Sequence, residues 1–242
     1  MRVQTLERLG QREPTFASLE QTPPPLESGD RLSLPEFERR YHAHPEIKKA
    51  ELIEGVVYVA SPVSARLHGD PHFDVIAWLG LYRAMTPNLR GSDNATLRLD
   101  LQNEPEPDAL LRLPENLGGK SYIAADGYLE GAPELIVEVA ASSASYDLHQ
   151  KKRVYARNQV PEYIVFETYE QQVHWFVLRQ GSYEEQRLDE EGVLKSQVLP
   201  GLWLHPAAFW AGDMATVFNG LNRGLASVEH AAFVEALTVK QK

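Results

Sequence analysis

The stretch PELIVEVAASSASYDLHQKKRVYARNQVPEYIVFE, residues 133–167, decides the fold of this chain. Two apolar runs, Leu135–Ala140 and Tyr163–Phe166, flank a segment from Tyr146 to Arg157 that is expected to be helical. A helix between two apolar strands is what a parallel crossover needs. The stretch therefore predicts a strand, a helix and a second strand parallel to the first, in the interior of a sheet.

Further elements are expected on both sides of this unit. SLPEFERRYHA predicts a helix capped by Ser33, and KKAELIEGVVYVASP predicts a hairpin that turns at Glu54-Gly55. A helix capped by Asp70 is expected next, followed by strands in NATLRLDLQ and PDALLRLP. After residue 161 we expect strands in EYIVFET, QQVHWFVLR and GSYEEQRL.

This order of elements predicts an α/β (α+β) fold with a central mixed β-sheet. The Pro-rich segment QTPPPLESGD indicates an extended N-terminal arm over residues 1–30. A single domain is expected over residues 31–210, and a helical tail over residues 211–242.

Composition excludes several classes of protein. The 242 residues are 43% hydrophobic and 24% charged, as in ordinary globular proteins, and contain no cysteine, which excludes disulfides and thiol catalysis. The chain has no apolar run long enough to span a membrane, and its charged N-terminus is unlike a signal peptide, so we expect a cytoplasmic protein without a membrane partner. The net charge of −10 argues against a dedicated duplex-DNA binder, although a local basic surface is compatible with it.

Two acidic residues stand in apolar strands. Glu138 lies in the middle of Leu135–Ala140, and Asp108 opens the next apolar run upstream. A buried carboxylate must be protonated, paired, hydrogen-bonded or bound to a metal. Two such acids on neighbouring strands can converge on one Mg²⁺ or Mn²⁺ ion, which prefers hard oxygen ligands. The alternative is a structural salt bridge with Arg112 or with a lysine of the following helix.

The helix after Glu138 brings a cation to the same region. Asp147, Lys151 and Tyr155 are spaced by four residues and lie along one face. If that face packs over the end of the strand, the Lys151 ammonium can reach the same water or phosphate. The simpler interpretations are a solvated Lys151, a packing role for Tyr155, and an Asp147 that caps the helix or pairs with Lys151. A local basic surface is formed by Lys152, Arg153 and Arg157.

Taken together, these motifs resemble the Uma-two family of restriction endonucleases, within the PD-(D/E)XK nuclease superfamily. The resemblance covers roughly residues 31–210. It is carried by Pro107-Asp108, LIVEVAASSAS, YDLHQKKRVYARNQVPEYIVFE, RLSLPEFERRY, AELIEGVVYVASPVSARLH and LPGLWLHPAAFW. It implies a restriction-endonuclease-like fold and a Mg²⁺- or Mn²⁺-dependent endonuclease that hydrolyses phosphodiester bonds of DNA. A homodimer is also expected, because two active sites cut both strands of a duplex most simply.

The resemblance also implies a metal between Asp108 and Glu138, with the backbone carbonyl of Val139 as an additional ligand. The usual lysine of the superfamily stands two residues after the acid, where this chain has Ala140. Lys151 matches the lysine that this family carries on the next helix, where it would orient or help deprotonate the attacking water and stabilise the pentacovalent phosphate.

Two further residues match the family pattern. His68 matches a common histidine and would support the water or the metal; its simpler interpretation is a surface or helix-capping group. Glu51 in AELIEG matches a glutamate that completes the acidic cluster, although an acid on a hairpin commonly faces water. This chain departs from the family pattern at Asp70-Pro71, shortly after His68, where family members more often continue the helix.

Two other classes of function compete with a nuclease. One is a module that keeps the nuclease fold with little or no activity and binds nucleic acid or protein; the net charge and Ala140 favour it. The other is a structural homo-oligomer that docks through the N-terminal arm and the C-terminal tail.

Overall fold

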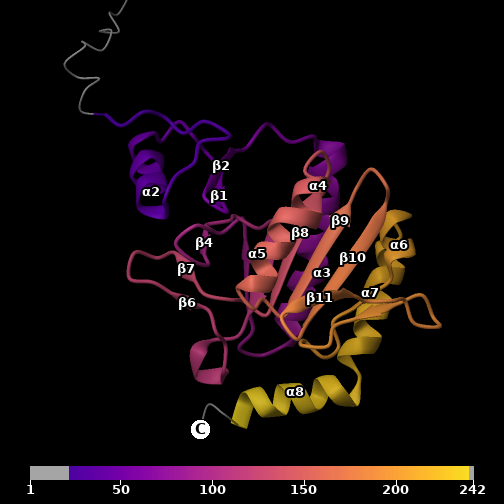
Figure 1. Cartoon of the computed structure of the whole chain (residues 1–242). Helices are drawn as coiled ribbons and strands as arrows, with labels where there is room; N and C mark the ends of the chain where they lie inside the picture. The colour runs from indigo at the N-terminus through magenta and orange to yellow at the C-terminus, as the bar shows by residue number, and fades with distance from the viewer. Residues whose placement is uncertain (1–21, 240–242) are drawn as a thin grey trace, which may run out of the picture.

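The crossover expected from the sequence is present in the computed structural model, which describes residues 22–239 (Figure 1). Strands β8 (Leu135–Ala140) and β9 (Glu162–Glu167) pair in parallel, with Leu135 opposite Glu162. The chain between them is helical as α4 (Ala144–Tyr146), η3 (Asp147–Lys151) and α5 (Lys152–Arg157). The helix thus begins two residues earlier than expected, and η3 is a wide π-helical turn. The bulk of the expected arm, residues 1–21, lies outside the described residues.

The central sheet of the described chain has six strands in the order β11-β10-β9-β8-β5-β3. Within it β8 and β9 are parallel and all other neighbours are antiparallel, so the sheet is mixed as expected. The edge strand β3 was not foreseen, because its sequence RGSD has no apolar alternation. The remaining strands are β3 (Arg90–Asp93), β5 (Ala109–Arg112), β10 (Gln172–Arg179) and β11 (Ser182–Glu185).

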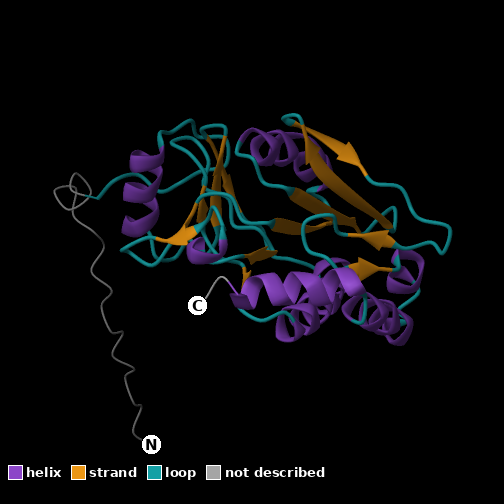
Figure 2. Cartoon of the chain, turned by 90° about the horizontal axis from the view of Figure 1, so that it is seen from below, coloured by secondary structure: helices purple, strands orange, loops and turns teal. Residues whose placement is uncertain are grey.

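Helices cover both faces of this sheet, as Figures 1 and 2 show. One face packs against α3 (Asp70–Met85), α6 (Pro206–Trp210) and α7 (Met214–Leu225). The other face packs against α5 and the hairpin of β1 (Ala50–Ile53) and β2 (Val56–Val59). Val137 and Val139 belong to the first core and Ile136 and Ala140 to the second, which explains why β8 is apolar at successive positions.

Smaller elements surround the central sheet. The hairpin turns at Glu54 (φ 53°) and Gly55 (φ 73°), the positive φ values of a type I′ turn, as expected. The expected length of the strand in NATLRLDLQ is wrong. Only Leu97–Arg98 forms a strand, β4, which belongs to a separate three-stranded sheet. The other elements are α2 (Leu34–Ala43), η2 (Glu115–Leu117), β6 (Tyr122–Ile123), β7 (Leu129–Glu130), β12 (Leu194–Lys195), β13 (Trp203–Leu204) and α8 (Val228–Val239).

The start of the long helix differs from the expectation. Asp70 does not cap it, because the helical chain begins five residues earlier as η1 (Ala65–Gly69) and runs directly into α3. The cap is Ser64, whose hydroxyl accepts a hydrogen bond from the Leu67 amide at 3.3 Å. The wide turn of η1 precedes Pro71, which has no amide proton to donate to a preceding turn. His68 therefore lies inside the first helical turns.

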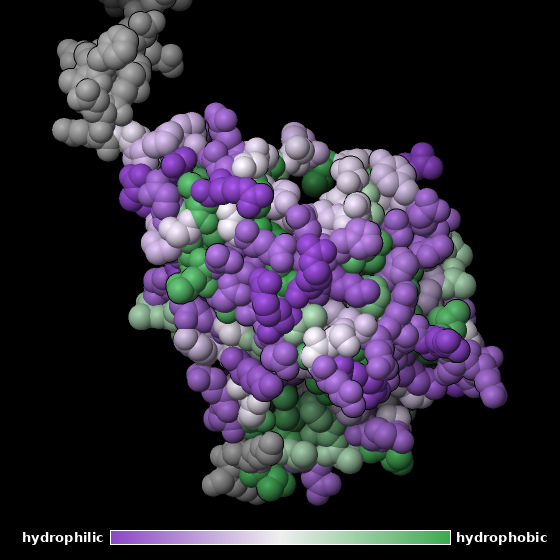
Figure 3. Space-filling view, viewed as in Figure 1, coloured by the Kyte–Doolittle hydropathy of each residue, from purple (hydrophilic) through white to green (hydrophobic). Residues whose placement is uncertain are grey.

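The outer surface over α5 is hydrophilic, whereas hydrophobic residues gather near α8 at the lower edge of the view (Figure 3). Arg153 and Arg157 are more than half exposed, so the basic surface expected on this helix is present. Among residues 22–239 no helix combines the length and the apolar character needed to cross a membrane.

Helix α7 docks through a close approach of two backbones. A Cβ atom added at Gly224 would overlap the carbonyl oxygen of Gly201. Gly201 itself has a φ of +88°. We therefore expect Gly224→Ala to lower the free energy of unfolding by roughly 1–3 kcal/mol, as overpacking does. Gly220 lies in the same helix with nothing within 4 Å of its added Cβ, so Gly220→Ala should instead stabilise by about 0.5–1 kcal/mol. Urea unfolding of both variants measures the contrast, and equal midpoints would contradict the close approach.

Candidate active site

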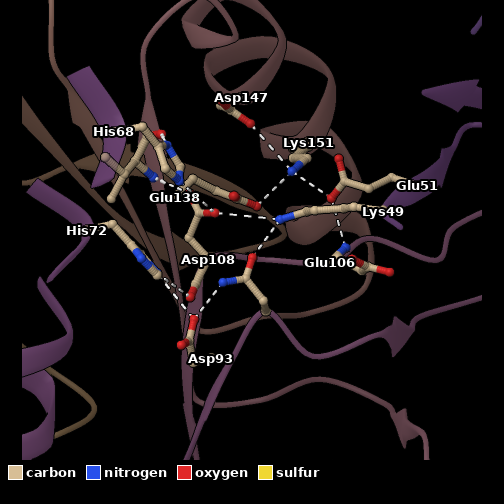
Figure 4. A network of polar contacts seen from close by, with 12 residues as sticks. Lys49, Glu51, His68, His72, Asp93, Glu106, Asp108, Glu138, Asp147 and Lys151 are labelled. Carbon is tan, nitrogen blue, oxygen red and sulfur yellow. Dashed lines mark hydrogen bonds and ion pairs between the residues drawn. The ribbon is translucent and has the colours of Figure 1, made fainter. Parts of the chain in front are cut away.

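The two acids of the sequence analysis lie opposite each other on neighbouring strands. Ala109 of β5 is the register partner of Val137 of β8, so the next residues outward, Asp108 and Glu138, face one another on the same side of the sheet. Both side chains are buried, at 5% and 3% exposure. Figure 4 shows their carboxylates pointing into one network of polar contacts. This is the arrangement that a shared cation would require.

Asp108 is held by the strand that carries Glu138. Its Oδ2 accepts a hydrogen bond from the Val139 amide at 2.8 Å. Its Oδ1 faces Lys49 Nζ at 3.7 Å and His68 Nε2 at 3.6 Å, both longer than a hydrogen bond. His68 Nδ1 lies 2.9 Å from the Val139 carbonyl oxygen and must donate to it, because a carbonyl can only accept. His68 thus bridges the two strands next to Asp108.

Glu138 is held by two residues of the crossover helix. Its Oε1 accepts from Lys151 Nζ at 2.9 Å and from the Tyr155 hydroxyl at 2.9 Å. Burial raises the pKa of Glu138 to about 8, against the lowering effect of Lys151 and with a further raising effect from Asp147. Of the two salt-bridge partners considered from the sequence, the helix lysine is the one that contacts Glu138, whereas Arg112 lies four residues after Asp108 at the other end of β5.

The ammonium of Lys151 lies close to three carboxylates. Its Nζ lies 2.8 Å from Glu51 Oε1, 2.9 Å from Glu138 Oε1 and 3.6 Å from Asp147 Oδ1. Burial lowers the pKa of Lys151, but the carboxylates raise it, and the net direction is well above its ordinary value. Asp147 and Lys151 stand at the two ends of the wide turn η3, and such π-helical turns are frequent at functional sites. The ammonium therefore stays charged.

Glu51 connects the hairpin to this network. It is buried, so the interpretation as a water-facing acid is wrong. Besides its contact with Lys151, its Oε1 accepts from the backbone amide of Glu106 at 2.7 Å. The structure thus brings together all five side chains singled out from the sequence, although they lie on separate elements of the chain.

These residues line a pocket of about 500 Å³. Within the described chain its lining includes four carboxyl groups and two ammonium groups, a formal excess of two negative charges when all four carboxyls are ionised. Its walls include Tyr58, Tyr146, Tyr169 and the loop of residues 60–64. The carboxylates are Glu51, Asp108, Glu138 and Asp147, and the ammonium groups are Lys49 and Lys151.

The donor set fits a hard divalent cation. Asp108, Glu138 and the Val139 carbonyl offer oxygen atoms, and the carbonyl has a second lone pair beside the one that His68 uses. Across residues 22–239 there is no group of three or more His, Asp or Glu side chains that would hold a metal by itself. Mg²⁺ commonly keeps several waters and is bound through one or two carboxylates plus substrate phosphates. The excess negative charge and these oxygen ligands agree with that mode of binding.

Two contributors were missed in the sequence analysis. Lys49 was not considered, yet it stands two residues before Glu51 in an alternating hairpin, which places both on one face. Tyr155 was interpreted as a packing residue; its ring does pack edge-on against Tyr163 at 4.9 Å, and its hydroxyl also binds Glu138. Its position four residues after Lys151 was the available signal.

Comparisons with known proteins concern the family and the fold. Residues 34–207 match the family Uma2, described as "Putative restriction endonuclease". A crystal structure of "a putative nuclease belonging to DUF820 from Anabaena variabilis ATCC 29413" is similar, with a TM-score of 0.51 and 13% identity. The match covers 78% of this chain and 99% of that one, and at this identity it concerns the fold alone. No curated protein matches.

The family match extends over well more than half of the chain and includes Asp108, Glu138 and Lys151. The fold is the mixed, helix-flanked sheet that the resemblance implied. The chain therefore belongs to the Uma2 (Uma-two) family of restriction-endonuclease-like proteins.

Proposed function

We propose that this protein is a Mg²⁺- or Mn²⁺-dependent endonuclease that hydrolyses phosphodiester bonds of DNA. One observation carries the proposal: Asp108 and Glu138 face each other across two strands in the lining of one pocket, with the Lys151 ammonium 2.9 Å from Glu138. Family membership supports a nuclease, and the excess negative charge of the pocket supports a divalent cation.

Each residue of the site has a separate role in this proposal. Asp108, Glu138 and the Val139 carbonyl would hold the cation. A divalent ion lowers the pKa of bound water and stabilises charge on a phosphoryl oxygen. Lys151 orients the Glu138 carboxylate and favours its ionised form, because the ammonium lowers the pKa of Glu138 against the effect of burial.

His68 and Glu51 support this arrangement from either side. His68 orients the Val139 carbonyl through Nδ1, and its Nε2 lies 3.6 Å from Asp108 Oδ1. Glu51 shares the Lys151 ammonium and thereby positions it.

The purified protein should nick or linearise supercoiled plasmid in the presence of Mg²⁺ or Mn²⁺, and EDTA should abolish this activity. EDTA should remove the metal readily, because the chain has no cysteine and residues 22–239 hold no ready-made side-chain cage that would retain metal against a chelator. Excess Mn²⁺ should then restore the activity. Gel electrophoresis of plasmid and of labelled duplex and single-stranded oligonucleotides measures the outcome. Cleavage that persists in EDTA, or that Glu138→Gln retains in full, would contradict the proposal.

A second candidate is a nucleic-acid-binding module without catalysis. The observation that favours it is that the Lys151 ammonium already pairs with carboxylates of the chain itself, as in a structural ion network. Salt-sensitive binding of oligonucleotides in Mn²⁺, without any cleavage, would select this candidate.

A further inference from the structure

We propose that Lys49 is the ammonium group that contacts the scissile phosphate, and that Lys151 acts as the internal counter-ion of the carboxylates. This inference rests on the proposed function and assigns to Lys49 the phosphate contact that the family resemblance gave to Lys151. Figure 4 shows both ammonium groups close to the carboxylates of Asp108 and Glu138.

The Lys151 ammonium is buried among three carboxylates of the described chain, two of them within 2.9 Å of its nitrogen and the third at 3.6 Å. An ammonium group carries three N–H donors and no acceptor. Three carboxylates surround the Lys151 nitrogen, those of Glu51, Glu138 and Asp147. Its side chain is 5% exposed, and the Tyr146 ring lies 5.4 Å from the nitrogen. A phosphate oxygen that bound Lys151 would compete with the buried carboxylates that already pair with this ammonium, and a buried charge that loses its partner is costly.

Lys49 has the opposite environment. Its nitrogen donates one hydrogen bond, at 2.7 Å, to the neutral side-chain oxygen of Asn94. Asp108 Oδ1 is its ion-pair neighbour at 3.7 Å, and within residues 22–239 the ammonium makes no other hydrogen bond or ion pair. Two of its three donors are therefore available to a ligand in the pocket. The side chain is 31% exposed, against 19% for His68 and 5% for Lys151, the other basic groups of the pocket lining.

The space beside Asp108 fits this role. Lys49 Nζ and His68 Nε2 both stand slightly too far from Oδ1 to form a hydrogen bond with it, at 3.7 and 3.6 Å. A phosphodiester anion that approaches a pocket with excess negative charge needs a cation at the open side. Among the described residues that line the pocket, Lys49 is the permanent cation that reaches solvent.

The strand of Glu138 supplies no such group. Ala140 stands two residues after Glu138, on the same side of the strand, and is fully buried in the apolar core against α5. An ammonium from the hairpin can take over the phosphate contact because Lys49 directly precedes β1, whose Glu51 already lies in the site. Lys49 is thus a catalytic residue of the proposed reaction.

The test compares Lys49→Met with Lys48→Met, a matched control. Lys48 is the preceding residue, outside the pocket lining, and its ammonium donates to the Pro45 carbonyl. We expect Lys49→Met to lower kcat by about 10²-fold or more, as loss of one group aimed at developing charge does, with a smaller change in KM. Lys49→Arg should recover part of the rate, and Lys48→Met should match the unaltered chain.

Binding is measured separately from cleavage. A labelled oligonucleotide is titrated with Ca²⁺ in place of Mg²⁺, with intact length checked on a gel. Lys49→Met should weaken binding and reduce the slope of log K against log salt concentration by about 0.7–0.9, the share of one phosphate contact. The thermal unfolding midpoint should change little, because Lys49 is partly exposed and its nitrogen lies 3.7 Å from Asp108, beyond hydrogen-bond distance. Lys49→Gln, which keeps a polar contact to Asn94, serves if the Met variant folds poorly.

The outcomes separate the two proposals. If the unaltered chain cleaves DNA and Lys49→Met behaves as Lys48→Met does, the Lys49 inference is overturned and the nuclease stands. If neither the unaltered chain nor any variant cleaves DNA, but Lys49→Met still weakens oligonucleotide binding relative to Lys48→Met, the nuclease proposal fails and the phosphate contact stands. If neither binding nor cleavage distinguishes the two variants, Lys49 has no contact with substrate.

Discussion

Glu138→Gln and Asp108→Asn are each expected to lower metal-dependent DNA cleavage by about a thousandfold. A bound cation contributes several kcal/mol of charge stabilisation, and about 1.4 kcal/mol corresponds to tenfold in rate. Both changes are nearly isosteric and keep the folding contacts. The amide oxygen introduced by Glu138→Gln can still accept from Tyr155, and the one introduced by Asp108→Asn can still accept from the Val139 amide. The loss should therefore come from the missing negative charge.

The matched control is Glu134→Gln. Glu134 directly precedes β8, is also buried, and accepts a hydrogen bond from the Leu113 amide at 2.6 Å, outside the pocket. Its variant should cleave as the unaltered chain does. Initial rates over a range of Mn²⁺ concentrations, together with Mn²⁺ titration calorimetry, measure the effect. Full activity of either site variant, at undiminished Mn²⁺ affinity, would mean that these carboxylates do not hold the cation.

Lys151→Met is expected to lower the free energy of unfolding by about 3–5 kcal/mol at neutral pH. Removal of one partner of a buried ion network leaves the others uncompensated, and three carboxylates depend on this ammonium. Lys152→Met is the control. Lys152 is the next residue, and its ammonium lies 3.6 Å from the centre of the Phe176 ring, a contact worth about 0.5–1 kcal/mol.

The loss in Lys151→Met should grow as pH rises. Burial raises the pKa of Glu138 to about 8 and that of Asp147 to about 6, from ordinary values of 4.5 and 3.8. At a pH between the ordinary and the raised pKa of such a carboxyl, the native state binds more protons than the unfolded chain. The free energy of unfolding therefore falls as pH increases. Lys151 opposes this by lowering both pKa values, and without it the carboxyls protonate more readily. Denaturant unfolding at pH 5 and pH 8 should show the smaller loss at pH 5; an equal loss would contradict the network.

Local pattern and tertiary packing contributed differently to the fold. The crossover of residues 135–167 was predictable because its strands and helix are each specified by short-range periodicity. Strand β3 and the short extent of β4 were not, because RGSD lacks alternation and NATLRLDLQ alternates over more residues than pair in the sheet. Their pairing is decided by neighbours distant in sequence. The cap of the long helix was misplaced for a related reason, since η1 extends it through a wide turn that no propensity indicates.

The sequence by itself determined that two acids stand in apolar strands, that a lysine follows on the crossover helix, and that the chain resembles a nuclease family. Strand alternation also placed Asp108 and Glu138 where a sheet could bring them together. Only the tertiary structure decided which N–H donors of each ammonium group remain available to a ligand. Lys151 is enclosed by acids from β1, β8 and η3, whereas Lys49 reaches the open pocket, because hydrogen-bond partners come from segments whose approach depends on packing of the whole domain.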